Sequence, residues 1–122
     1  MQDVKAAMRS EMQDFDRALF RSAAGLQASR RTLDAAWDEI AGHAGGNDLA
    51  SREAASLLAT ARWSVASALV RAESRGMHLR VDALETRADF GRRLLAGGLD
   101  EITTRWDAPA TCARQAVEQA EP

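Results

Sequence analysis

Apolar residues recur at steps of three and four along the first half of the chain, the spacing that places them on one face of a helix. The first such stripe predicts a single helix over about residues 3–20. Its apolar members are Val4, Met8, Met12, Phe15 and Leu19. The charged residues between them, which include Glu11 and Asp14, are expected to face water.

A second helix is predicted to begin after Ser22, because a serine hydroxyl can accept a hydrogen bond from the first turn of a helix. Its apolar stripe consists of Leu26, Leu33, Trp37 and Ile40. Three glycines are expected to end it, since glycine readily takes the left-handed conformation that follows many helices. They are Gly42, Gly45 and Gly46, with His43 in the last turn.

A third, longer helix is predicted over about residues 49–75, with Asn47 or Asp48 as its N-cap. Gly76 is expected to end this helix. The residues expected on its buried face are Ala50, Ala54, Leu57, Leu58, Ala61, Val65, Ala68, Leu69 and Ala72.

These elements predict an all-α fold. Alanine is abundant and long β-branched runs are missing, which favours helix. Short links between the helices favour antiparallel neighbours, so residues 1–76 are predicted to form an up-down-up three-helix bundle, similar in arrangement to a spectrin repeat.

The C-terminal part of the chain is predicted to be extended and partly irregular. Residues 77–109 are expected to pack on the bundle, with an extended stretch over 77–84 and a short helix over 86–96. Residues 99–106 are ambiguous, because their β-branched residues favour a strand but no partner strand is evident. Residues 110–122 are expected to form a flexible tail.

Composition and charge exclude several classes of protein. The 122 residues suffice for one domain, and 16 basic against 18 acidic residues leave no electrostatic footprint for nucleic acid. No apolar run approaches transmembrane length, so direct membrane insertion is not expected. The single Cys112 cannot form an internal disulfide, and no signal-peptide pattern is seen at the N-terminus. We therefore expect a cytoplasmic protein.

Few residues suggest a chemical site. His43 and His78 are the only histidines, and no Cys or His pair has zinc spacing, so no metal site is expected. The pair Gly97-Gly98 lacks the strand and helix that flank a phosphate-binding loop. Trp63 falls off the main stripe of the third helix, which suggests a contact with another domain, and the pair at 92–93 is expected to be solvated.

The most informative segment is residues 71–82, Arg-Ala-Glu-Ser-Arg-Gly-Met-His-Leu-Arg-Val-Asp. It resembles the C-terminal helical domain of the succinate dehydrogenase/fumarate reductase flavoprotein family, which includes L-aspartate oxidase. In that family the third helix ends in Arg-x-Glu-Ser-Arg-Gly-x-His-x-Arg-x-Asp. The matching residues are Arg71, Glu73, Ser74, Arg75, Gly76, His78, Arg80 and Asp82. The resemblance covers about residues 4–82 and departs at Leu84, where a proline is common.

The matching residues, which we call the motif residues, allow two interpretations. They can form a hydrogen-bonded helix terminus that holds the following loop, or a polar row that contacts a flavin domain near its substrate cleft. We expect no catalytic role, because titratable groups at helix ends are often structural. A structural role and an interdomain contact are compatible with each other.

The resemblance implies the function. Family members bind FAD through an N-terminal dinucleotide-binding domain, which this chain lacks. The chain is therefore expected to bind no FAD itself, to be inactive alone, and to buttress an FAD-binding domain of the same or a partner chain. A homo-oligomer is compatible with this role. The alternative is a stand-alone helical bundle that binds a protein partner.

Overall fold

The computed structural model describes residues 2–42 and 48–108 of the chain. Its helices are α1 (Gln2–Gln13), α2 (Phe15–Leu19), α3 (Ala23–Ala41), α4 (Leu49–Val70) and the short 3₁₀ helix η1 (Ala88–Phe90), and its strands are β1 (Leu94–Gly97) and β2 (Thr103–Trp106). The expectations for Asn47, His43, Gly45, Gly46 and the tail at 110–122 lie outside the described residues.

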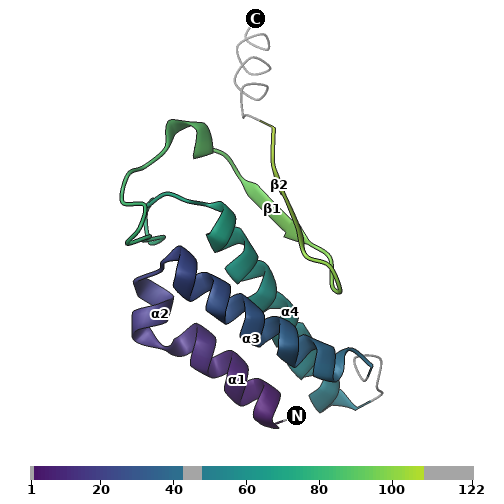
Figure 1. The fold of residues 1–122 in the computed structure, drawn as a ribbon. Coiled ribbons are helices and arrows are strands. Elements are labelled where there is room, and N and C mark those ends of the chain that lie inside the picture. Colours follow the sequence, from purple (N-terminus) through teal and green to yellow (C-terminus); the bar gives the residue numbers. More distant parts are fainter. Residues whose placement is uncertain (1, 43–47, 109–122) are drawn as a thin grey trace, which may run out of the picture.

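The three long helices pack against one another around one core. Each of α1, α3 and α4 contacts the other two, and α3 runs opposite to its two neighbours (Figure 1). The predicted stripe of α3 is confirmed, since its members are all buried: Leu26, Leu33, Trp37 and Ile40. From the other two helices come Val4, Leu58, Ala59, Ala61 and Val65. The mostly helical character of the chain is thus confirmed.

The predicted single helix over residues 3–20 is wrong, because it breaks at Asp14. The backbone of Asp14 is extended, and its carboxylate accepts a hydrogen bond from the Arg17 N–H at 3.1 Å. Asp14 is therefore the N-cap of a new helix, α2, a position that aspartate favours. After this break Phe15 is 68% exposed and Leu19 36% exposed, so neither joins the predicted buried stripe.

The ends of the other helices confirm the predicted start signals but not the stop signals. Ser22 and Asp48 are the N-caps of α3 and α4, accepting from backbone N–H groups at 3.1 and 2.8 Å. Gly42 has an ordinary right-handed helical conformation, so the left-handed role expected for it is wrong. On α4, Leu57 and Ala50 are exposed, contrary to the predicted buried face.

The all-α prediction is wrong in the C-terminal part, where β1 and β2 form an antiparallel sheet. Leu94 pairs with Trp106 and Gly97 with Thr103, so the strand that lacked a partner in the sequence has one. The predicted helix over 86–96 gives way to this pairing, and only η1 remains of it. The turn requires Gly98, whose φ is +90° and where a Cβ would lie 1.9 Å from the Glu101 carbonyl oxygen.

Helix α4 contacts β1 and β2, which together with the turn between them are called the hairpin below (Figure 1). The Trp63 indole N–H donates to the Gly98 carbonyl at 2.6 Å, and the buried Arg62 guanidinium donates to the carbonyls of Leu99 and Asp100. The polar atom of Trp63 is thus engaged by its own chain, while its side chain is only half-buried, and its contact with another domain stays a prediction.

Candidate functional site

The motif residues begin just beyond the last turn of α4. The predicted helix end at Gly76 is wrong, since α4 ends at Val70 and the chain then leaves the helix. Gly76 instead serves a tight turn in which Arg75 and His78 exchange backbone hydrogen bonds of 2.8 and 3.0 Å. Its φ of +56° at the first central position is a conformation that glycine adopts without strain.

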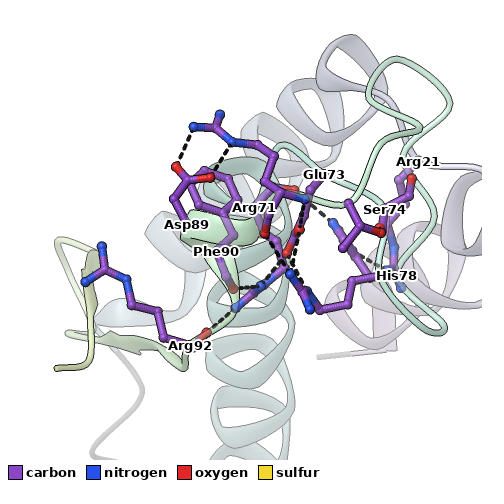
Figure 2. Close-up of polar contacts among 11 residues, drawn as sticks. Arg21, Arg71, Glu73, Ser74, His78, Asp89, Phe90 and Arg92 are labelled. Atoms are coloured by element: carbon purple, nitrogen blue, oxygen red, sulfur yellow. Dashed lines mark hydrogen bonds and ion pairs between the residues drawn. The ribbon is translucent and has the colours of Figure 1, made fainter. Parts of the chain in front are cut away.

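Glu73 is the centre of a buried ionic cluster. Its side chain is fully buried and accepts hydrogen bonds from Arg71 Nη1 at 2.6 Å and Arg75 Nε at 3.0 Å (Figure 2). Its other carboxylate oxygen accepts from the backbone N–H of Arg87 at 2.8 Å. A buried carboxylate of this kind needs all of these donors, because burial without partners is costly.

The donors around Glu73 keep its carboxyl ionised. Burial alone would raise the pKa of Glu73, but hydrogen bonds from Arg75, the Arg87 backbone and Arg71 outweigh it and lower the pKa to about 2. A carboxyl that stays ionised throughout the neutral range and has no open side is unsuited to general acid or base catalysis. Glu73 and the groups that donate to it thus form a buried ionic core.

Arg80 and Asp82 join the ends of two helices. The buried Arg80 guanidinium donates to the Ala68 carbonyl at the C-terminus of α4 at 2.9 Å, and it forms two 2.8 Å bonds to Asp82. Asp82 in turn accepts from the Ala23 N–H at the N-terminus of α3 at 2.9 Å. The cation lies at a helix C-terminus and the anion at an N-terminus, the arrangement that helix dipoles favour.

His78 connects this loop to the link before α3. Its Nε2 lies 2.9 Å from the Arg71 carbonyl oxygen, so Nε2 carries the proton and donates. Its Nδ1 then accepts from Arg21 Nη1 at 2.9 Å, which requires a neutral ring (Figure 2). Burial and the positive charges of Arg21, Arg80 and Arg71 lower the pKa of His78, which agrees with this neutral state.

Ser74 holds the path of the loop that follows the turn. Its hydroxyl accepts from the Arg80 N–H and donates to the Ala83 carbonyl, both at 2.9 Å. Its own backbone groups bond to the Glu85 carbonyl and to the Thr86 hydroxyl. The extended stretch predicted over 77–84 forms no regular strand, and only single bridges join Arg21 to Arg80 and Arg75 to His78.

Arg71 links the motif to the hairpin. Its guanidinium donates to the carbonyls of Phe90 and Arg92 at 2.9 and 2.8 Å and lies over the Trp106 ring, 4.9 Å from the ring centre. Trp106 also stacks on Phe90, with 4.6 Å between ring centres. Arg71 therefore joins η1 and the sheet to the end of α4, in addition to the contacts of Arg62 and Trp63.

Two cavities meet at Arg71 and His78. One of about 310 Å³ lies among α1, α2, α3 and α4 and includes the buried Glu11, which pairs with Arg17 at 2.8 Å and Ser29 at 2.6 Å. The expectation that Glu11 faces water is wrong. The other is a groove of about 760 Å³ between the motif and the hairpin.

The structure brings all the motif residues together at one end of the molecule. Sequence reasoning missed several of their partners, because these are distant in the chain and carry no local signal. The missed partners are Arg21, Ala23, Arg87, Phe90 and Arg92.

The pair Gly97-Gly98 does not form a phosphate-binding loop. Gly97 and Gly98 lie in a hairpin turn and not before a helix, so they cannot place backbone N–H groups around the pyrophosphate of FAD. Within residues 2–42 and 48–108, no group of three His, Cys, Asp or Glu side chains could hold a metal ion. No helix in the same residues is long and apolar enough to cross a membrane.

Comparison with known proteins gives one match. A family model described as the fumarate reductase flavoprotein C-terminus matches residues 5–106, which include every motif residue and the whole hairpin. No curated protein and no solved structure gives a significant match to the chain.

Proposed function

The chain belongs to the family of fumarate reductase flavoprotein C-terminal domains, and we propose that it braces an FAD-binding domain of the same or a partner chain without taking part in the chemistry. FAD and the substrate then bind to that other domain. In this proposal the motif residues make the interdomain contact. The ionic core around Glu73 holds that contact surface in place.

The observation that supports this role is that the motif side chains bind one another. Glu73, Arg80, Asp82 and His78 all have protein partners at hydrogen-bond distance, and these partners join α3, α4 and the hairpin. A site that processes a substrate must leave donors and acceptors open toward a cavity. A closed network instead gives a rigid end to the molecule, which suits a bracing surface.

The same proposal includes the domain organisation. Residues 1–76 would form the up-down-up three-helix bundle and residues 77–109 a segment packed on it. A cytoplasmic location also belongs to the proposal, since the single Cys112 provides no internal disulfide. A homo-oligomer is compatible with it. The alternative of a stand-alone interaction module loses support, because Trp63 is bonded to the hairpin.

Two measurements test the role. The purified chain is expected to be helical by circular dichroism, colourless, and inactive with fumarate or aspartate. The chain can be co-expressed with an FAD-binding flavoprotein domain that lacks its own helical domain and is encoded in the same open reading frame or a neighbouring one. The chain is then expected to co-purify with that domain and to raise its melting temperature. A yellow isolated chain with a flavin spectrum, or no co-purification, would contradict the proposal.

A further inference from the structure

The groove between the motif and the hairpin is lined mainly by arginines. The charged residues along it are Arg71, Arg75, Arg92, Arg93 and Asp107. Including the buried Glu73 behind Arg71 and Arg75, four guanidinium groups face two carboxylates. The groove is therefore positive, although the chain as a whole has a net charge of −2.

The Arg92 guanidinium is available to bind a ligand. Among the described residues its side chain makes no hydrogen bond or ion pair, and its guanidinium lies 5.5 Å from the centre of the Trp106 ring. Figure 2 shows this guanidinium pointing away from the ionic core, while the Arg92 carbonyl is held by Arg71. The backbone is thus fixed and the five N–H donors are available to a ligand.

Arg93 and Arg75, which line the same groove as Arg92, also have N–H donors that can bind a ligand. Arg93 is 83% exposed and pairs with Asp107 at 2.6 Å through one nitrogen, a surface ion pair that contributes little and can exchange partners. Arg75 is 40% exposed and uses Nε and Nη2 on Glu73 and on the Arg87 carbonyl, which leaves Nη1 without a partner in the described part of the chain.

From these contacts we propose that the groove binds an acidic segment of the flavin-bearing partner, whose carboxylates pair with Arg92 and Arg93. The inference rests on the proposed function, because Arg71, Arg75 and His78 of the motif line the same groove. Planar guanidinium groups match carboxylates in two-point hydrogen bonds, which supplies direction as well as charge.

A protein segment fits better than a nucleic acid. The positive charge is confined to one groove, and an acidic chain with a pI of about 5.7 repels a polyanion elsewhere along its surface. The aromatic side chain of Phe90 on the groove wall and the neighbouring hairpin add apolar contact area for a polypeptide.

The first test uses a short fluorescein-labelled peptide of alternating Asp and Gly, titrated with the full chain and followed by anisotropy. The expected dissociation constant is below about 1 mM, and binding weakens about tenfold between roughly 50 and 500 mM NaCl. The double variant Arg92→Gln/Arg93→Gln is expected to bind about tenfold more weakly, since each replacement removes a charge-assisted hydrogen bond.

The matched control is Arg30→Gln/Arg31→Gln, an adjacent exposed pair on α3 with the same change in net charge. It is expected to bind within about twofold of the original chain. Equal weakening in both double variants, no binding at 1 mM, or equal binding of the peptide with Asn in place of Asp would overturn the proposal. Displacement by tripolyphosphate at about tenfold lower concentration would show a phosphate site instead, and would also overturn it.

Co-purification with the FAD-binding domain distinguishes a failure of the groove proposal from a failure of the bracing role. If the original chain binds the FAD-binding domain and Arg92→Gln/Arg93→Gln abolishes this, the acidic contact is supported. If the double variant still binds as well as the original chain, the groove proposal fails while the bracing role stands. If the original chain does not bind at all, the bracing role itself fails. Circular dichroism of both double variants verifies the fold.

Discussion

Replacement of Glu73 by glutamine is expected to lower the free energy of unfolding by about 3.5 kcal/mol. The amide keeps the shape of the carboxylate but loses its charge and presents an N–H₂ group where an oxygen accepted hydrogen bonds. Arg71 and Arg75 then lose their shared anion, and one of the donors around Glu73 meets another donor. Breaking a buried ionic group by removing one partner is among the larger effects of a single substitution.

The magnitude follows from the exposure of each donor. Arg71 is 19% exposed, and its 2.6 Å bond to Glu73 is charge-assisted, so its loss costs about 2 kcal/mol. Arg75 is 40% exposed and is partly screened by water, so its share is about 0.5 kcal/mol. A donor–donor contact at the Arg87 N–H adds about 1 kcal/mol.

Urea unfolding followed by circular dichroism measures this change, and Glu39→Gln on the exposed face of α3 is the control. The midpoint of Glu73→Gln is expected to fall by roughly 2 M, and that of the control to stay within about 0.5 M. Equal midpoints for the two variants would refute the ionic core.

If Glu73→Gln fails to fold, acid titration of the original chain tests the same point. The folded-state pKa of Glu73, about 2, lies below its ordinary value of 4.5. The stability that its ionised form contributes is therefore complete above pH 4.5 and is lost as the pH falls toward 2. A chain whose unfolding free energy stays constant over this window would contradict the assignment.

Three further changes have defined outcomes. His78→Gln keeps one donor and one acceptor but cannot titrate. Because the pKa of His78 is lowered in the fold, the original chain should lose stability as the pH falls below about 6.5. The variant should lose less stability than the original chain at pH 5, as measured by urea unfolding. Gly98→Ala should destabilise the chain by about 2 kcal/mol or more, while Gly97→Ala, with open space at its Cβ, should cost less than about 1 kcal/mol in thermal melts. Asp14→Ala should cost about 1 kcal/mol through loss of the α2 cap, and an unchanged melting temperature would contradict that role.

The local signals in the sequence predict the starts of α3 and α4. Ser22 and Asp48 are N-caps in the structure because a side-chain oxygen reaches an N–H only three residues away. The apolar stripe of α3 is buried as expected, since helical periodicity alone determines which residues share a face. The motif residues were likewise identified from sequence, and the family match covers all of them.

Where helices end, and where strands pair, depends on contacts between distant segments. Helix α4 ends at Val70, and Arg80, ten residues on, donates to the carbonyls of Ala68 and Leu69 in its last turn. Residues 86–96 are predicted to be helical, yet Leu94–Gly97 forms a strand because Thr103–Trp106 pairs with it and Trp63 of α4 binds the turn between the two strands.

The amino-acid sequence by itself determined the helical character of most of residues 2–42 and 48–70, the N-caps of α3 and α4, and the family to which the chain belongs, because each depends on side chains a few positions apart. The tertiary structure alone decided which groups the motif side chains contact. The sequence left open whether the charges at 71, 73, 75, 80 and 82 form a hydrogen-bonded helix terminus or a polar row that contacts another domain, whereas folding buries Glu73 and Arg80 and pairs each with an opposite charge. The physical reason is that a charge is buried only where distant segments supply its partners, and those segments meet only in the folded chain.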